Sequence, residues 1–258
     1  MPDDRPATQG PDVALNPGSH GEGRSLREAW DANAQAWIRW ARSYELDHSF
    51  WQLNLPTLLA LLPLPGEMTL DVGCGEGRVA RALRERGHHV VGVESSPALA
   101  HAAREADPAF EVHVADAAAL PLADGSADLA VASLSLMNMD DMPTVVREIA
   151  RVLRPEGCLC FSVLHPLNSW GDAGDVAYFE TVHYSEELVR LQASLTVHDT
   201  HRPLSDYTQA LEAAGFLIEA LREPVPSAAY VAAHPDAARW QRRPGFLHVR
   251  AILSLGDR

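Results

Sequence analysis

Residues 70–78 read L-D-V-G-C-G-E-G-R, and this stretch decides the fold. Asp71 closes a short apolar strand, and Gly73, Gly75 and Gly77 occupy the turn into the helix that follows. Glycine has no Cβ, so the backbone can turn sharply there and approach a ligand closely. The start of the helix adds free N–H groups. The unit therefore predicts a ligand site at the carboxyl edge of a parallel sheet.

Strand and helix patterns alternate on both sides of this unit. We predict strands at 68–72, 89–94, 111–116, 127–134, 158–164, 217–223 and 246–255. We predict the intervening helices at 77–86, 97–106, 142–153 and 204–216. The last two strands follow one another without a helix, so they can pair antiparallel. The expected fold is α/β, with a doubly wound, mostly parallel seven-stranded sheet whose last strand is antiparallel.

The chain divides into segments of different composition. Residues 1–24 are rich in Pro and Gly and predict a disordered tail. Residues 25–65 predict two helices, the first opened by Ser25 and the second covering 47–62. Residues 66–258 form the α/β domain, in which the regular pattern breaks over 165–203. An interruption of that length predicts a functional insertion.

Composition narrows the possible partners. The chain has 258 residues, with 21 Lys+Arg against 35 Asp+Glu and a formal charge of −14. This balance argues against nucleic acid and against an anionic membrane. The first residues contain no apolar core of a signal peptide, which predicts a cytoplasmic protein. Cys158 and Cys160 alternate along a strand, which favours buried packing over metal binding.

Two carboxylates after the glycine turn indicate the kind of ligand. Glu94 ends the second strand, where a carboxylate can hold ribose hydroxyls, and Asp116 ends the third, within reach of an adenine amino group. A dinucleotide fingerprint needs a third glycine at position 78, which is Arg78 here. A nucleoside ligand therefore fits better than a pyrophosphate.

The sequence resembles the class I S-adenosylmethionine-dependent methyltransferases, and within them the broad small-molecule branch (methyltransferase type 11-like). The resemblance lies in LDVGCGEG, VVGVESSP, VADAAALPLADGSADLAVASLSL and REIARVLRPEGCLCFSV, which together cover about residues 67–164. It implies that residues 66–258 bind S-adenosylmethionine and release S-adenosylhomocysteine, with 25–65 as a helical lid. It also implies these cofactor-binding residues: Asp71, Gly73, Gly75, Gly77, Glu94, Ser95, Asp116, Ala117 and Ser133.

The residues expected to bind the methyl acceptor are predicted from their residue types. His165 directly follows the fifth strand, so it emerges at the cofactor edge and is our candidate catalytic base. Aromatic and histidine side chains predict the walls of a substrate site: Trp37, Trp40, Tyr44, Trp170 and His201. His198 and His201 lack a carboxylate or thiolate cluster, so no metal is expected.

These observations predict a methyltransferase that acts by in-line displacement on a small, partly aromatic metabolite, at oxygen, nitrogen or carbon. A monomer or homodimer is expected. Two alternatives stay open, namely a protein of this fold that binds the cofactor without methyl transfer, and an NAD(P)-dependent oxidoreductase. Arg78 and the absence of lysine, which excludes a Tyr-x-x-x-Lys pair, argue against the oxidoreductase.

Overall fold

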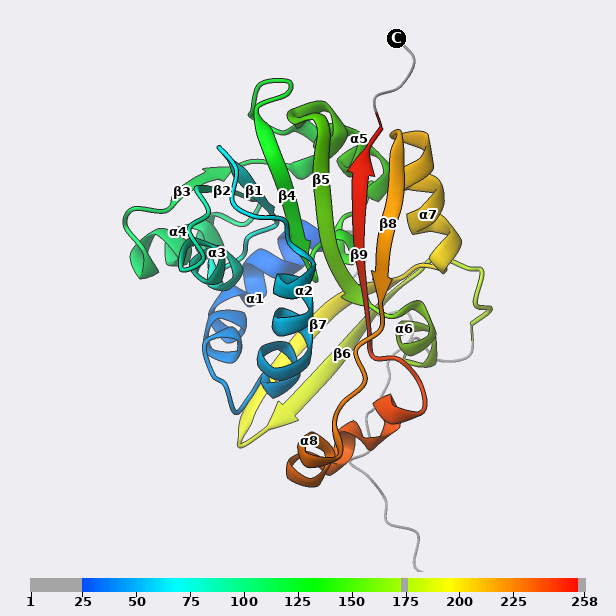
Figure 1. Ribbon diagram of the computed structural model, residues 1–258. Coiled ribbons are helices and arrows are strands. Elements are labelled where there is room, and N and C mark those ends of the chain that lie inside the picture. The colour runs from blue at the N-terminus through cyan, green and yellow to red at the C-terminus, as the bar shows by residue number, and fades with distance from the viewer. Residues whose placement is uncertain (1–24, 173–175, 255–258) are drawn as a thin grey trace, which may run out of the picture.

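The computed structural model describes residues 25–172 and 176–254, and its main feature is a seven-stranded sheet (Figure 1). The strand order is β3-β2-β1-β4-β5-β9-β8, and only the pairs made by β9 are antiparallel. The strands are β1 (Thr69–Val72), β2 (Val90–Glu94), β3 (Glu111–Val114), β4 (Ala127–Ser133), β5 (Leu153–Leu164), β8 (Phe216–Arg222) and β9 (Phe246–Leu253). The predicted fold class is confirmed.

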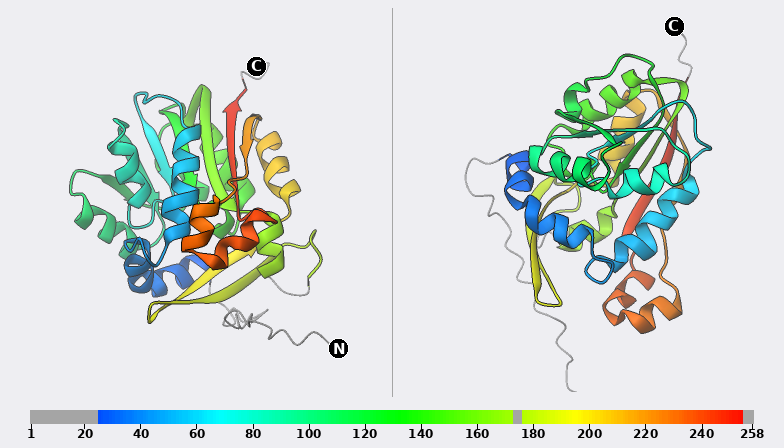
Figure 2. Two further views of the ribbon diagram at one scale, coloured as in Figure 1. Left: turned by 60° about the horizontal axis from the view of Figure 1, so that its bottom comes forward. Right: turned by 90° about the vertical axis from the view of Figure 1, so that its left-hand side faces the viewer.

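Helices cover both faces of the sheet (Figures 1 and 2). One face packs on α5 (Met142–Val152) and α7 (Leu204–Ala213), and the other on α2 (Leu55–Leu61), α3 (Arg78–Arg84) and α4 (Pro97–Ala106). Short 3-10 turns η2 (Ala117–Ala119) and η3 (Leu136–Asn138) follow β3 and β4. The sheet strands are apolar on both faces because both are covered.

The N-terminal segment forms α1 (Leu26–Ala41), with the predicted capping box between Ser25 and Glu28. The single helix expected over 47–62 is instead interrupted by a π-helical turn, η1 (Phe50–Asn54), which continues into α2. Pro56 explains the interruption, since it has no N–H to donate to the carbonyl four residues earlier. Leu55 N–H bonds the carbonyl of Phe50 instead.

The insertion holds more regular structure than its sequence indicated. It contains α6 (Pro166–Asp172) and an antiparallel hairpin, β6 (Val182–Arg190) and β7 (Ala193–His201). The turn is Leu191–Gln192, both with positive φ, as a two-residue hairpin turn requires. The hairpin passes beneath the carboxyl ends of β4 and β5 and contacts α1 (Figure 1).

A second unpredicted segment, α8 (Ala228–Ala233) with the 3-10 helix η4 (Pro235–Gln241), lies at the same end beside the helix that contains η1 (Figure 2). Its anchor is a stack of His48 on His234, with ring centroids 3.7 Å apart, and a 2.6 Å hydrogen bond between His48 Nδ1 and the Tyr230 hydroxyl. Arg190 ties the hairpin to the Leu46 carbonyl and to Asp236. We call α1, the hairpin and the α8–η4 segment the cover.

Two further predictions concern the cysteines of β5 and the N-terminal tail. Cys158 and Cys160 are buried on one face of β5, with their sulfur atoms 3.6 Å apart, as expected. The predicted disordered tail lies outside the described residues. No helix within 25–172 and 176–254 has the length and apolar character needed to cross a membrane.

Candidate cofactor and acceptor site

The glycine turn has the backbone that its sequence predicted. Gly73, Gly75 and Gly77 have φ of +69°, +57° and +83°, a region that side-chain-bearing residues rarely adopt. A Cβ on Gly73 would lie 2.8 Å from Cβ of Ser135, and one on Gly75 would lie 3.6 Å from Nε1 of Trp37. The turn is therefore a cradle of bare backbone beneath α1.

Glu94 is held by backbone N–H groups at the end of β2. Its Oε2 accepts from Gly75 N–H at 2.9 Å, and its Oε1 accepts from Ser96 N–H at 2.8 Å. Burial raises the pKa of this carboxyl, while the N–H donors lower it. A carboxylate offers about four acceptor sites, and backbone N–H groups of Gly75, Ser95 and Ser96 use three of them, so Glu94 can still accept from a ligand hydroxyl.

Asp71 lies behind the glycine turn at the end of β1, and it is 1% exposed. Its Oδ2 has no hydrogen-bond partner. Burial and the nearby charge of Glu94 raise the pKa of Asp71 to about 7. A buried acceptor without a partner costs stability unless a donor reaches it. The orphaned oxygen and the glycine cradle thus fit a ligand that carries donor groups, as S-adenosylmethionine does.

Side chains that the sequence did not single out close this site. Asp31 of α1 accepts from the Ser96 hydroxyl and, at 3.3 Å, from Ala98 N–H, which fastens α1 to the start of α4. Glu76, 1% exposed, accepts from Arg42 at 2.7 Å and from Arg81 at 2.6 Å. Glu76 stands inside the quoted motif, so its position was a usable signal, whereas nothing local marked Asp31.

The predicted adenine residues lie along the next strand ends. Asp116 is exposed and accepts from Ala118 N–H at 2.8 Å, which caps η2, while Ala117 is buried. Ser95 is half-buried beside Glu94. Their contact with an adenine stays a prediction.

Ser133 ends β4 at the centre of the carboxyl edge. Its Oγ accepts from the Asn54 amide nitrogen at 3.2 Å and lies 3.3 Å from Oγ of Ser162. Two residues later, the Ser135 hydroxyl donates to the Val72 carbonyl at 2.7 Å, which fixes the segment after β4 against the glycine turn.

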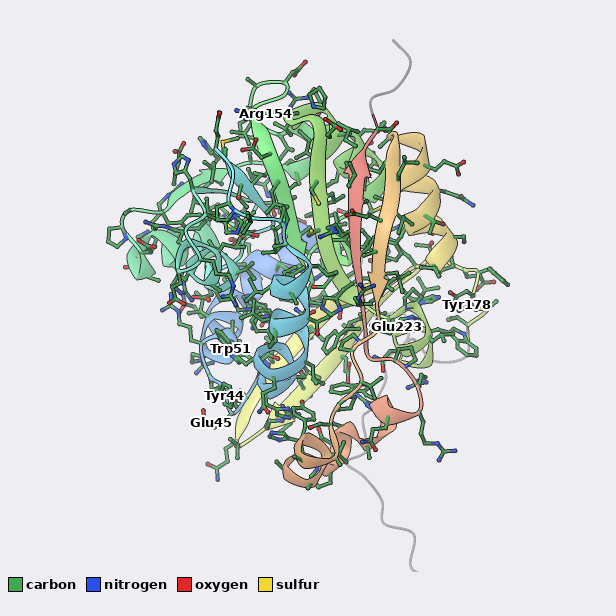
Figure 3. The ribbon with its side chains drawn as sticks, in the orientation of Figure 1. Tyr44, Glu45, Trp51, Arg154, Tyr178 and Glu223 are labelled. Carbon is green, nitrogen blue, oxygen red and sulfur yellow. The ribbon has the colours of Figure 1, made fainter. Side chains whose placement is uncertain are left out.

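The aromatic residues of α1 have different surroundings. Trp37 lies over Gly75 and meets Trp30 edge-to-face, with ring centroids 5.4 Å apart. Trp40 is 5% exposed and packs on the hairpin residues Leu195 and Val197. Tyr44 is 52% exposed near the end of α1 (Figure 3). Among the three predicted aromatic walls, the structure places Trp37 next to the glycine turn.

His165 is buried, and both of its ring nitrogens are engaged. Nδ1 accepts from Leu167 N–H at 3.1 Å, and Nε2 lies 2.9 Å from Oε1 of Glu223, at the end of β8 (Figure 3). Burial lowers the pKa of His165, and Glu223 partly offsets this effect. The imidazole therefore has no free lone pair for a general base, and its catalytic role stays a prediction.

The other two predicted acceptor residues, Trp170 and His201, make their hydrogen bonds to residues of the insertion. Trp170 is 39% exposed and donates to the Val176 carbonyl at 2.7 Å. His201 is fully buried between the Ser169 hydroxyl and the Tyr178 carbonyl, each 2.9 Å away. Within the described ranges, no group of three or more His, Cys, Asp or Glu side chains is arranged to hold a metal.

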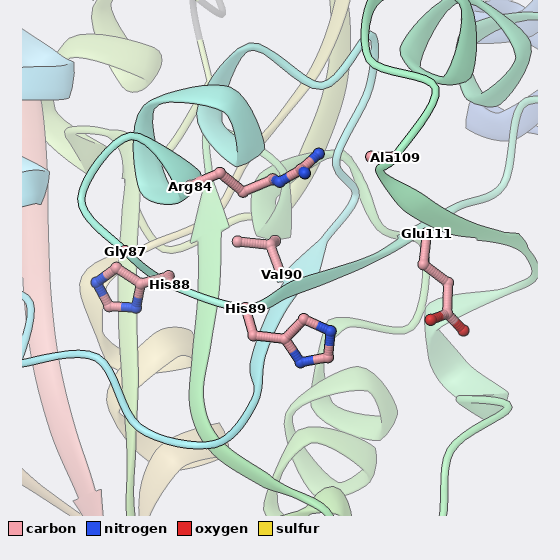
Figure 4. Close-up of a pocket in the computed structure, with 7 residues that line it drawn as sticks. All are labelled: Arg84, Gly87, His88, His89, Val90, Ala109 and Glu111. Carbon is pink, nitrogen blue, oxygen red and sulfur yellow. The ribbon is translucent and has the colours of Figure 1, made fainter.

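A depression of about 400 Å³ lies at the opposite, amino end of β2 and β3 (Figure 4). Its lining includes Arg84, His89 and Glu111. The Arg84 guanidinium is paired with Asp107, so the depression offers no free cation there. The carboxyl edge remains the site that the buried polar groups define.

The strand order and the helices on both faces of the sheet are those of the Rossmann-like methyltransferase fold. Residues 70–161 match the family described as Methyltransferase domain. The chain therefore contains a class I S-adenosylmethionine-dependent methyltransferase domain, which confirms the predicted class and its cofactor.

Relatives of known name and structure agree with this assignment. A malonyl-[acyl-carrier protein] O-methyltransferase of Serratia marcescens is 37% identical over 42% of this chain and 44% of its own length. The chain thus spans about half the length of the curated relatives it matches. The crystal structure of an S-adenosylmethionine-dependent methyltransferase from Mesorhizobium loti superposes with a TM-score of 0.62, at 28% identity over 82% of this chain and 99% of that one. A Listeria monocytogenes structure, at 22% identity, has the same fold with a TM-score of 0.65, covering 78% of this chain and 96% of that one.

Proposed function

We propose that this protein transfers the methyl group of S-adenosylmethionine to a small, partly aromatic acceptor that binds under the cover. The observation that carries the proposal is the Glu94 carboxylate, bridged between Gly75 and Ser96 N–H groups beside the unpartnered Oδ2 of Asp71. When bound, S-adenosylmethionine supplies an electrophilic methyl group on a sulfonium.

The chain's residues contribute orientation and exclusion of water. Glu94 accepts from the ribose hydroxyls, and the glycine turn lets the backbone lie against the ligand. Trp37 and the hairpin roof the site, so the acceptor meets the methyl group away from bulk water. The half-buried indole of Trp37 beside the glycine turn supports an acceptor with a flat apolar part.

Isothermal titration calorimetry tests cofactor binding, with S-adenosylhomocysteine and S-adenosylmethionine against NADH. Radiolabelled S-adenosylmethionine with a metabolite panel then tests transfer. We expect heat with both adenosyl ligands, none with NADH, and label in a small product. Binding without transfer to any acceptor would favour the non-catalytic alternative, and heat with NADH alone would overturn the proposal.

A second candidate acceptor is a carboxyl group carried on an acyl carrier protein. The names of relatives at 32–37% identity favour it. Those matches cover between 42% and 63% of this chain. Malonyl-acyl carrier protein in the same radiolabel assay distinguishes the two, because label would then appear on a protein as a base-labile methyl ester.

A further inference from the structure

A row of polar residues crosses the carboxyl edge beside the glycine turn. Ser133 of β4 pairs in register with Ser162 of β5, which pairs with His248 of β9. Residues in one register row project to the same face of a sheet. Asn54, the last residue of the π-helical turn, covers this row, since its amide nitrogen bonds Ser133 Oγ.

His248 and Asn54 are in contact, and each retains an unpartnered buried atom. His248 Nε2 lies 3.1 Å from the backbone carbonyl of Asn54. A carbonyl only accepts, so Nε2 carries the proton and Nδ1 of the neutral ring is a bare lone pair. Both residues are 0% exposed, and neither Nδ1 of His248 nor Oδ1 of Asn54 has a hydrogen-bond partner.

Both unpartnered atoms are hydrogen-bond acceptors, so each needs a donor, and one ligand with two donors would satisfy both. A buried hydrogen-bond acceptor that has no donor lowers stability by about 1–3 kcal/mol. A water molecule satisfies two acceptors at once and needs only polar partners and a space of its own size. The two lone pairs of this water then remain free to accept hydrogen bonds from donor groups of a bound methyl acceptor. A π-helical turn at this position agrees with the frequent occurrence of such turns at functional sites.

We propose that Asn54 Oδ1 and His248 Nδ1 hold a water that forms the inner wall of the methyl-acceptor site and accepts a hydrogen bond from an N–H or O–H group of the acceptor. This inference rests on the proposed methyl transfer. It selects acceptors that carry such a donor near the reacting atom, next to Ser133. His248 is a positioning residue here, acting through the water.

The charge state of His248 suits this role. Burial lowers the pKa of His248 to about 4, against the opposing effect of the hydrogen bond to Asn54. The ring therefore stays neutral at ordinary pH, and Nδ1 remains an acceptor. The charged neighbour on β9, Arg250, donates to the Leu61 carbonyl and pairs with Glu219. We expect no inflection between pH 6 and 8 from His248 in the acceptor KM.

Two substitutions separate the two nitrogens of the ring. His248→Gln keeps an N–H donor at the ε position, for the Asn54 carbonyl, and removes the acceptor at the δ position. His248→Asn keeps an acceptor at the δ position and removes the ε donor. With the acceptor found by the radiolabel panel, His248→Gln should raise KM or lower kcat about tenfold or more, a loss on the scale of one unmade buried hydrogen bond. His248→Asn should stay within about threefold, and both variants should bind S-adenosylhomocysteine as the parent protein does.

A high-resolution crystal structure with S-adenosylhomocysteine tests whether Asn54 and His248 hold a water. This test does not need a methyl acceptor. We expect a water within about 3.2 Å of both atoms. The proposal is overturned if no water lies between the two atoms, or if the Asn54 amide is turned so that its nitrogen bonds His248 Nδ1. Either result counts even if methyl transfer is demonstrated. Equal kinetic losses in the two variants would assign His248 to the fold alone and also overturn it. A panel that yields no acceptor counts against the proposed function, while the crystal structure still decides the water site.

Discussion

The cofactor edge and the cover are built in different ways. The edge, formed by residues 71–77 and 94–96, is held mostly by backbone groups, as in the bonds from Gly75 and Ser96 to Glu94. The cover is held by side chains from distant parts of the chain, as in the contact of His48 with Tyr230. A backbone site tolerates few substitutions at its turns, whereas a side-chain assembly can change its lining without altering the fold. The edge is therefore suited to one fixed cofactor, and the cover to specificity.

The largest expected effect is at Gly73, where the cofactor edge has no space for a side chain. Gly73→Ala adds a Cβ 2.8 Å from Ser135 at a backbone φ of +69°. The strained backbone costs about 1–2 kcal/mol, and displacement of Ser135 should add to the loss in the free energy of unfolding and weaken S-adenosylhomocysteine binding. Urea unfolding and calorimetry measure the two losses.

Gly125→Ala is the matched control, because Gly125 also has a positive φ, +61°, but no atom lies within 4 Å of the added Cβ. It should show only the backbone cost and bind the cofactor normally. If the two variants lost the same stability and both kept full affinity, the close approach at Gly73 would have no role in the site.

Glu94→Gln tests the carboxylate that the backbone holds. The amide retains one acceptor but turns an NH₂ group toward one of the two N–H donors, Gly75 or Ser96. We expect S-adenosylhomocysteine affinity to fall by roughly 1–3 kcal/mol, measured by calorimetry. Asp116→Asn, at the exposed end of β3, should have a smaller effect. Unchanged affinity in Glu94→Gln would remove this carboxylate from the cofactor site.

Asp71 should make the stability of the edge depend on pH. Its pKa is raised from 3.8 to about 7 in the folded protein. The folded state therefore binds more protons than the unfolded state between these values, so the free energy of unfolding falls as pH rises from about 4 to about 7. The slope is at most about 1.4 kcal/mol per pH unit.

Asp71→Asn should remove this contribution. In urea unfolding at pH 5 and pH 8 without ligand, the variant should gain stability relative to the parent protein as pH rises. A parallel pH dependence in both proteins would show that Asp71 is ionised without penalty in the folded state.

The sequence predicts the cofactor edge better than it predicts the cover. The strand order and the glycine turn were predictable because apolar periodicity and positive-φ glycines are local signals. The hairpin was not, since its turn residues are Leu191 and Gln192 rather than the Asn-Gly or Asp-Gly pairs that indicate such turns. His248 lies in an apolar strand and Asn54 in a helix, so nothing local marks them as polar partners. Their relation appears only when the strand and the helix pack together.

The smallest expected effect concerns the cover. Burial and the neighbouring charges of Arg190 and His234 lower the pKa of His48 to about 4, from 6.5 in the unfolded chain, against the opposing influence of Asp236 and Asp47. The unfolded state therefore binds more protons between these values, and stability is lost as pH falls from about 6.5 toward 4. His48→Asn keeps an acceptor for the Tyr230 hydroxyl and should lose less stability over this range in urea unfolding. His101 on α4 is exposed, so His101→Gln is the control and should follow the parent protein.

The contact of His48 with Tyr230 fastens the α8–η4 segment and not the cofactor edge. S-adenosylhomocysteine affinity should therefore change little in His48→Asn. If that affinity fell in step with stability, the cover and the cofactor edge would not be the separately built regions that their contacts indicate.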